Sequence, residues 1–181
     1  MPTEKELASR ERLSCEIEVT PAFYDIDVME IVYHGNYVRY LELARSALLA
    51  RFDYDYPRMR DSGFGWPVVD MRLKYVRAAT FGQKLRIRST ITEWENRLRI
   101  DYVISDAGTG QKINTAHTIQ VAVDMKTREM RFVCPPVLWE RLGSSHEILG
   151  CMRRAVGLGA DGICSKRRAR WGEGAGRAGS A

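Results

Sequence analysis

The sequence lacks the marks of several protein classes. Its four cysteines are widely spread and form no C-x-x-C pair, which predicts ordinary thiols rather than a zinc site or a disulfide framework. No uncharged apolar run approaches the roughly 20 residues that span a bilayer, and the charged first residues hold no apolar signal core. A glycine-rich phosphate-binding loop is also missing. We therefore expect a cytoplasmic protein with no membrane insertion and no metal site.

Excess positive charge is confined to one end of the chain. The net charge is +5, but residues 143–181 carry seven Lys or Arg and only three Asp or Glu, so residues 1–142 are nearly neutral. Basic charge is therefore poor evidence for nucleic-acid binding by the folded part, and no nucleic acid is expected. We predict a flexible lead-in over residues 1–12, one domain over residues 13–142 and a disordered Gly/Arg-rich tail over residues 143–181.

The strongest pattern is an amphipathic helix that begins near Asn36 and runs to about Phe52. Charged residues, including Glu42 and Arg45, lie on its other face, where an ion pair between neighbouring turns is expected at the surface. Asn36 is predicted to be the N-cap of this helix. The apolar stripe recurs at three- and four-residue spacings and comprises Tyr37, Tyr40, Leu41, Ala44, Ala47, Leu48 and Phe52.

Strands account for most of the remaining pattern. Alternating apolar residues predict strands over residues 14–23, 68–79, 84–94, 97–106 and 111–125, with a further short segment over residues 130–136. Residues 53–67 are rich in aromatic, Gly and Pro residues and read as a connection, and residues 137–142 fit a last helical turn. One long helix and several antiparallel strands must bury their apolar faces against each other, which predicts an α+β layer.

Two aspartates precede the helix. Asp25 and Asp27 form a D-x-D sequence, and the residues IVYHGNY (31–37) lie between them and the helix. Free backbone N–H groups at a helix start can stabilise a developing oxyanion, while a nearby carboxylate can act as nucleophile or general base. Aspartates before a helix also commonly cap it, so a purely structural role is the alternative.

The same stretch resembles the signature of the hotdog-fold thioesterases of the hydroxybenzoyl-CoA thioesterase family, in particular the branch with a VYHxNY motif. The resemblance covers residues 13–142. It implies a hotdog fold, in which an antiparallel sheet of five to six strands wraps one long central helix. It also implies hydrolysis of an acyl-CoA or acyl carrier protein thioester without a cofactor. The expected assembly is a homodimer or homotetramer whose sites lie at the subunit interface.

The resemblance also implies which residues form the site. Asp27 matches the catalytic aspartate, which attacks the thioester carbonyl or activates water. His34 matches the histidine of the motif, whose backbone N–H faces the thioester oxygen and whose ring lines the site or makes a structural hydrogen bond. Gly35 permits close approach of the substrate to the backbone. Tyr33 and Asn36 complete the expected substrate-binding set, with packing and capping as their alternative roles.

Two acidic residues leave other interpretations open. Glu30 stands where family members commonly have glycine, and its side chain either narrows the acyl pocket or points to solvent. Glu42 is a rival catalytic acid, because another hotdog branch places its acid inside the central helix. The aromatic residues Phe64 and Trp66 are candidates to contain the acyl group. Candidates for binding CoA are Lys74, Arg77, Arg86 and Arg88.

Two other functions fit the same fold. A hotdog dehydratase or hydratase would use a histidine and an acid on the acyl Cα and Cβ, although the usual spacing of these residues is not evident. A non-catalytic acyl-thioester-binding protein would keep the fold without turnover, and Glu30 is the feature that favours it.

Overall fold

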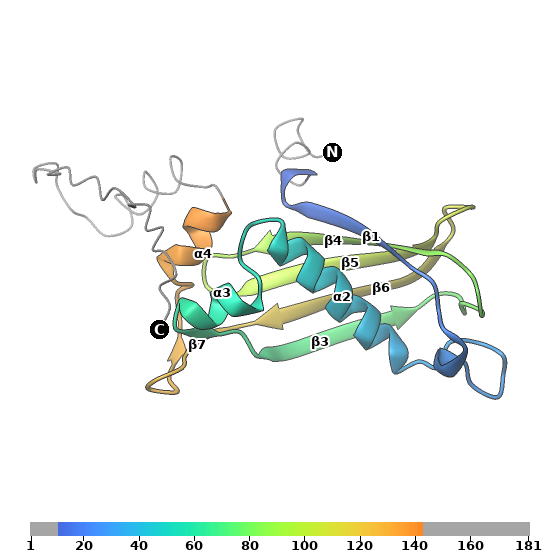
Figure 1. Ribbon diagram of the computed structural model, residues 1–181, viewed down its shortest axis with the longest axis horizontal. Helices are drawn as coiled ribbons and strands as arrows, with labels where there is room; N and C mark the ends of the chain where they lie inside the picture. The colour runs from blue at the N-terminus through green and yellow to red at the C-terminus, as the bar shows by residue number, and fades with distance from the viewer. Residues whose placement is uncertain (1–10, 143–181) are drawn as a thin grey trace, which may run out of the picture. The chain divides into compact units, whose positions relative to one another are not determined.

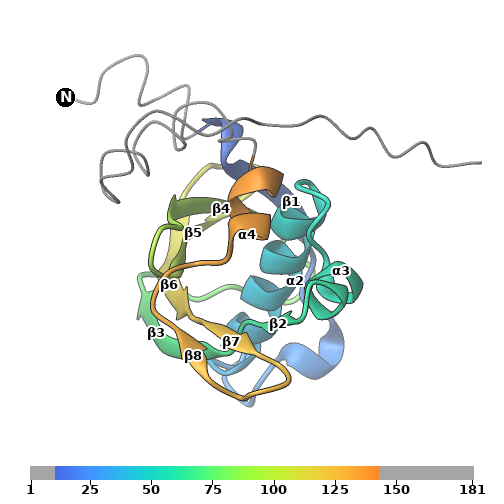
Figure 2. The same cartoon turned by 90° about the vertical axis from the view of Figure 1, so that its left-hand side faces the viewer.

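The computed structural model describes residues 11–142, all within one compact unit. Helix α2 (Asn36–Ala50) crosses one face of a five-stranded antiparallel sheet (Figure 1), and the sheet curves round it (Figure 2). The predicted α+β hotdog architecture is confirmed. The strand order is β1-β4-β5-β6-β3, with β1 at Ser14–Val19, β3 at Val68–Tyr75, β4 at Leu85–Glu93, β5 at Leu98–Asp106 and β6 at Lys112–Gln120.

The core lies between α2 and the sheet. The register places Ile87 of β4 beside Ile17 of β1 on one side and Ile104 of β5 on the other, so one apolar row crosses three strands. On α2 the predicted stripe is buried at Tyr37, Tyr40, Leu41, Ala44 and Leu48, each at most 3% exposed. The apolar sides of β4, β5 and α2, which these spacings predict, therefore face each other in a single hydrophobic core.

Short elements connect and flank the main sheet. They are a 3-10 turn η1 (Phe23–Asp25), α3 (Tyr56–Asp61), β2 (Phe64–Gly65), β7 (Ala122–Asp124), β8 (Met130–Arg131) and α4 (Pro136–Arg141). Strands β2, β7 and β8 form a second sheet in the order β2-β7-β8. The connection predicted over residues 53–67 thus holds a short helix and a short strand. No helix in residues 11–142 is long and apolar enough to cross a membrane.

Three predicted strands end earlier in the structure. The strand predicted over residues 68–79 stops at Tyr75, where β3 ends. The strand predicted over residues 14–23 stops at Val19, and the chain then passes Pro21 into η1. The single strand predicted over residues 111–125 is wrong, because β6 ends at Gln120 and β7 belongs to the second sheet. At the break, the N–H of Val121 donates to the carbonyl of Pro67 at 3.4 Å, so the chain changes partners there. The tail predicted over residues 143–181, and residues 1–10 of the predicted lead-in, lie outside the described residues.

Candidate active site

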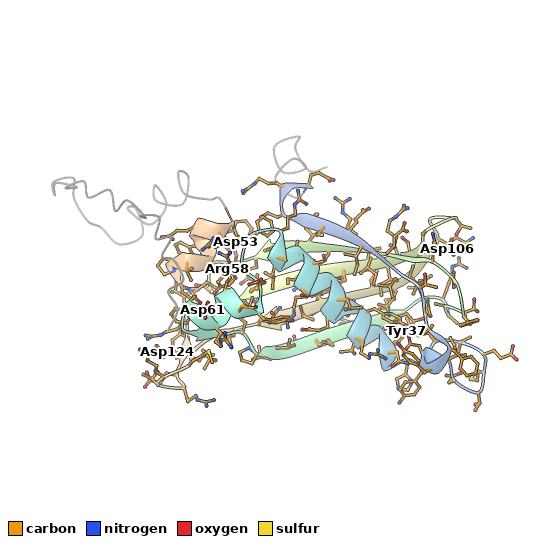
Figure 3. All side chains as sticks on the ribbon, in the orientation of Figure 1. Tyr37, Asp53, Arg58, Asp61, Asp106 and Asp124 are labelled. Atoms are coloured by element: carbon orange, nitrogen blue, oxygen red, sulfur yellow. The ribbon has the colours of Figure 1, made fainter. Side chains whose placement is uncertain are left out.

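A cavity of about 390 Å³ lies at the N-terminal end of α2, where Tyr37 is labelled in Figure 3. It is lined by Asp27, Met29, Ile31, Val32, His34, Tyr37, Tyr75, Val76, Arg77 and Ala78. A second hollow, of about 500 Å³, lies at the other end of the domain, where Arg58 and Asp61 are labelled. The first cavity brings the D-x-D loop, the helix start and the end of β3 together, and it is the candidate site.

Asp25 anchors the acidic loop, the segment that contains Asp25 and Asp27, to α2. Its side chain is almost fully buried, at 3% exposed. Its carboxylate accepts hydrogen bonds from the Tyr40 hydroxyl at 2.8 Å, from the Arg39 guanidinium at 2.9 Å and from the backbone N–H of Ala22 at 3.1 Å. A buried carboxylate is costly unless it is paired and hydrogen-bonded, and this one has a charged donor and two neutral donors. Asp25 therefore has a structural role, which sequence reasoning left open.

Asp27 is arranged differently from Asp25. Its Oδ1 accepts from the backbone N–H of Met29 at 2.8 Å, its N–H donates to the Ile31 carbonyl at 2.9 Å, and its carbonyl accepts from Glu30 N–H at 3.0 Å. These bonds fix the backbone of the loop and one carboxylate oxygen. The other oxygen, Oδ2, has no hydrogen bond to any group in residues 11–142. One carboxylate oxygen of Asp27 is therefore hydrogen-bonded, and the other is available to a ligand in the cavity.

The start of α2 supplies free backbone donors beside the same cavity. The N–H groups of His34 and Gly35 donate to no group within the described part of the chain, and the helix has no side-chain cap. The His34 carbonyl is held by the Tyr75 hydroxyl at 3.0 Å. Unpaired N–H groups at a helix start favour a negatively charged ligand atom.

Asn36 is not the N-cap, which corrects the prediction. The helix begins at Asn36 itself and its N-cap is Gly35. The Asn36 side-chain amide instead donates to the Asp25 carbonyl at 3.0 Å, and the Tyr33 N–H donates to the same oxygen at 2.9 Å. Asn36 is therefore occupied in holding the acidic loop against the helix start.

Tyr33 and Gly35 lie just outside the lining of the cavity. The ring of Tyr33 packs against that of His34, with centroids 4.2 Å apart. A Cβ on Gly35 would lie 2.8 Å from Cε1 of Tyr33, which is closer than real Cβ contacts. Glycine at position 35 thus leaves room for the Tyr33 ring. Phe64 and Trp66 also line no part of this cavity, and Trp66 is buried in the core, where its indole N–H donates to Tyr54.

Glu42 is held in an ion pair. Arg45 donates to its two carboxylate oxygens at 2.5 and 3.0 Å, and the Tyr56 hydroxyl donates to one of them as well. Burial alone would raise the pKa of Glu42, but these bonds outweigh it and lower the pKa. Arg45, predicted at the helix surface, is only 7% exposed and also donates to Gln120 of β6 at 2.5 Å. Glu42 therefore has a structural partner and lies outside the candidate cavity.

Glu30 has a backbone conformation that favours glycine. Its φ is 62°, in the left-handed region that side chains with a Cβ rarely adopt. Its side chain is exposed and is not among those lining the cavity. A glycine at this position would therefore suit the backbone of the turn after Asp27.

Sequence reasoning named Arg77 as a candidate for binding CoA, but it did not predict that the end of β3 joins the site. Tyr75, the last residue of β3, and Arg77, in the bend after it, both line the cavity. The segment after β3 is held beside the motif by direct contacts, since the N–H of Val32 donates to the Ala79 carbonyl at 2.8 Å and Ile31 pairs with Thr80. Among residues 11–142, no group of three or more His, Cys, Asp or Glu side chains is placed to hold a metal ion.

Comparison with known proteins identifies the family of this chain. The model of the thioesterase-like superfamily matches residues 21–156. A "Putative esterase" of Synechocystis sp. is 31% identical over 128 residues, which cover 70% of this chain and 77% of that protein. A "Putative acyl-CoA thioesterase" of Bacillus subtilis is 34% identical over 79 residues, 44% of this chain and 56% of that protein, so the match spans little more than half of its length.

Solved structures share the fold. The crystal structure of a 1,4-dihydroxy-2-naphthoyl-CoA thioesterase from Synechocystis superposes with a TM-score of 0.65. The superposition covers 71% of this chain and 95% of the other, at 22% sequence identity. At this identity the likeness establishes the hotdog fold and leaves the substrate open. Because the family model matches well over half of the sequence and the fold is shared, the chain belongs to the thioesterase-like superfamily.

Proposed function

We propose that the protein hydrolyses acyl-CoA thioesters to the free acid and the thiol, with Asp27 as the catalytic carboxylate. The observation that carries this proposal is that Asp27 and the unpaired helix start at His34 border a single cavity. A thioester carbonyl is already electrophilic and its thiolate leaves readily, so one carboxylate and one oxyanion site suffice. The names of two relatives, the acyl-CoA thioesterase of Bacillus subtilis and the naphthoyl-CoA thioesterase of Synechocystis, support this substrate class.

Two routes are open to Asp27. As a nucleophile, its free oxygen attacks the thioester carbonyl, the C–S bond breaks to release the thiolate, and water then hydrolyses the mixed anhydride. As a general base, it takes a proton from a water that attacks the carbonyl directly, and the thiolate receives a proton as it leaves. In both routes the carbonyl oxygen becomes an oxyanion. The N–H groups of His34 and Gly35 are the donors we assign to it.

The other site residues have supporting roles in this proposal. The His34 ring lines the cavity, and its orientation is supported by the adjacent Tyr33 ring. Asn36 holds the acidic loop against the helix start through its bond to Asp25. The sequence Val32-Tyr33-His34-Gly35-Asn36-Tyr37 also leads us to place the chain in the VYHxNY branch of the hydroxybenzoyl-CoA thioesterase family.

A substrate panel tests the proposal. Short-chain, long-chain and aromatic acyl groups are presented as CoA and as acyl carrier protein thioesters, and thiol release is followed with a thiol reagent. We expect release from at least one CoA thioester, and its loss in Asp27→Asn. Binding of the thioesters without any release would favour the non-catalytic alternative instead.

A hydratase or dehydratase is the second candidate, because an acid and a histidine, Asp27 and His34, border the same cavity. Such an enzyme adds water across, or removes it from, the Cα–Cβ bond and leaves the thioester intact. An enoyl-CoA substrate separates the two reactions. Loss of the enoyl absorbance without thiol release would favour the second candidate.

We also propose a homodimer formed through β3. This strand ends the main sheet, and its outer edge has no strand partner in residues 11–142. Val68, Val69 and Tyr75 on or beside this edge are 39 to 56% exposed, and an exposed apolar edge strand is a ready site for pairing with another chain. Sedimentation is expected to show a dimer or tetramer. Val69→Arg should weaken it, whereas Val133→Arg, at an equally exposed valine after β8, should not.

A cytoplasmic location completes the proposal. The two cysteines in the described part of the chain, Cys15 and Cys134, are free thiols, as is usual in a reducing compartment. Fractionation of cells with an antibody against the protein would test this location.

A further inference from the structure

Arg77 is the one cationic side chain among the residues that line the Asp27 cavity within the described part of the chain. Seven of the ten lining residues are apolar or aromatic, and the other three are Arg77, Asp27 and His34. The Arg77 side chain has no hydrogen bond or ion pair within residues 11–142. By contrast, Arg39 is paired with Asp25 and Arg86 with Glu18. An arginine without a partner beside a largely apolar cavity favours an anionic ligand.

Arg77 lies in the bend just after β3 and borders the cavity together with its neighbours Tyr75, Val76 and Ala78. Within β3, successive residues point to opposite faces, so Tyr75 lies on one face while Arg72 and Lys74 share the other. Arg72 and Lys74 indeed line a different hollow, together with His117 of β6. The N–H groups of Val76 and Arg77 both donate to the Ile113 carbonyl, at 2.9 and 3.0 Å. The Arg77 backbone is therefore fixed independently of its side chain.

We propose that Arg77 binds an anionic group of the substrate and makes the site selective for thioesters that carry one. This inference rests on the proposed function. Two parts of such a substrate can supply anionic oxygens: a carboxylate on the acyl group, or the phosphates of CoA. Each offers the guanidinium fork two oxygen acceptors.

The position of Arg77 favours the acyl carboxylate. Arg77 and Asp27 border one cavity of about 390 Å³, so an anion on Arg77 lies close to the reacting carbonyl. The pantetheine arm has about 13 bonds between its sulfur and the first phosphate, and an extended chain gains about 1.2 Å per bond. The CoA phosphates thus lie roughly 15 Å from the sulfur in an extended arm. An acyl group with a terminal carboxylate needs no such span.

Four substrates and three variants test the proposal. Glutaryl and pentanoyl groups, of equal carbon number and different charge, are each presented as CoA and as pantetheine thioesters. The variants are Arg77→Gln, Arg77→Lys, which keeps the charge but loses the fork, and Arg72→Gln, which removes the charge of a nearby arginine on the other face of β3. Melting curves on all variants check the fold. KM and kcat are measured separately.

We expect Arg77→Gln to raise the KM for both glutaryl thioesters by about tenfold or more, in line with loss of a charged hydrogen bond. The KM for the pentanoyl thioesters should change little in Arg77→Gln, and Arg72→Gln should leave the KM for all four substrates nearly unchanged. Arg77→Lys should give an intermediate KM for the glutaryl thioesters. If Arg77→Gln instead raises the KM for both CoA thioesters and for neither pantetheine thioester, the CoA phosphates are the anion that Arg77 binds. If Arg77→Gln matches Arg72→Gln on all four substrates, the proposal is overturned.

Binding measurements test the role of Arg77 separately from the proposed hydrolysis. If the native protein releases thiol from none of the four substrates, hydrolysis of these thioesters is rejected, and calorimetry with the same thioesters then decides the role of Arg77. Weaker binding of the charged thioesters to Arg77→Gln than to Arg72→Gln supports it. Equal binding to both variants, or no binding to the native protein, overturns it.

Discussion

The hydroxyl of Tyr40 in α2 donates a hydrogen bond of 2.8 Å to Oδ2 of Asp25 in the acidic loop, and both side chains are buried. Burial, and then the bond to Asp25, raises the pKa of Tyr40, so the phenol remains a donor at any ordinary pH. Asp25 is two residues before Asp27. The position of the proposed catalytic carboxylate relative to the helix start therefore depends on a contact that touches no substrate.

Removing the charge of Asp25 should lower both stability and turnover. Asp25→Asn keeps the size of the side chain but weakens its bonds with Tyr40 and Arg39, and a buried bond to a charged group contributes about 1.5–3 kcal/mol. Arg39 is more than half exposed, which places the expected loss near the lower end of that range. The midpoint of urea unfolding measures it. Tyr40→Phe is the companion variant, and native-like midpoints and turnover in both would refute the anchoring role.

Asp27 should matter for turnover and little for stability. Asp27→Asn removes the charge while keeping size and much hydrogen bonding, so kcat should fall by roughly a hundredfold or more. Its melting curve should stay close to that of the native protein, since the main-chain bonds of the loop remain. Thiol release with the best substrate of the panel is the measurement.

Glu42→Gln is the matched control for Asp27→Asn. Its carboxylate is engaged by Arg45 and Tyr56 and lies away from the cavity lining. We expect some loss of stability, because the buried guanidinium of Arg45 loses its ionic partner, but only a mild effect on kcat. Near-normal turnover in Asp27→Asn together with a collapse in Glu42→Gln would reverse the assignment.

Local periodicity was enough to predict the main elements and their α+β layer, whereas the hotdog arrangement was implied by the family resemblance. Alternation in β4 and β5 and the three- and four-residue spacing in α2 each report which side of an element is apolar, and those sides face each other in the core. Arg45 was misplaced because its burial depends on Gln120, which is 75 positions away in the sequence. The break at Val121 was missed for a similar reason, since a strand pattern does not say which sheet it joins.

The candidate site could likewise be predicted only in part from local sequence. Asp27 and His34 are seven residues apart and meet at one cavity, and the motif that contains them is local in the sequence. Tyr75 and Arg77 join them through long-range contacts, because the Tyr75 hydroxyl donates to the His34 carbonyl and the Val32 N–H donates to the Ala79 carbonyl. The contrast between buried Asp25 and available Asp27 also depends on Tyr40 and Arg39, whose side chains reach Asp25 only after α2 has formed.

Lowering the pH should reduce the stability of the folded protein, in part through Asp106. Its carboxylate accepts hydrogen bonds from Gln83 and from the backbone and hydroxyl of Thr109, which together lower its pKa from the ordinary value of 3.8 to about 2. Because the folded pKa is the lower one, this contribution to stability is complete above about pH 4 and is lost as the pH falls towards 2. Asp106→Asn cannot titrate. Its deficit in melting temperature relative to the native protein should therefore shrink between pH 4 and pH 2, and a constant deficit would contradict this account.

Residues 143–181 should be dispensable for activity. Their Gly/Arg-rich composition differs from that of the domain, and α4 ends at Arg141 with the N–H of Leu142 bonded to the Leu138 carbonyl. A chain ending after Leu142 should unfold cooperatively and retain turnover. The family match extends to Val156, so a second chain ending there is the control. Loss of the unfolding transition in the shorter chain alone would show that residues 143–156 belong to the domain.

Glu30→Gly should stabilise the protein without changing the site. A residue with a Cβ pays about 1 kcal/mol or more to hold the left-handed φ of 62° seen here, and glycine does not. Part of the gain is lost because glycine is also freer in the unfolded chain. A net gain of about 0.5–1 kcal/mol, equivalent to a few degrees in Tm, is expected. Glu30→Ala keeps the Cβ and should show no such gain. Since Glu30 lines no part of the cavity, both variants should keep native turnover across acyl groups. If both instead accept bulkier acyl thioesters than the native protein does, the Glu30 side chain narrows the acyl pocket after all.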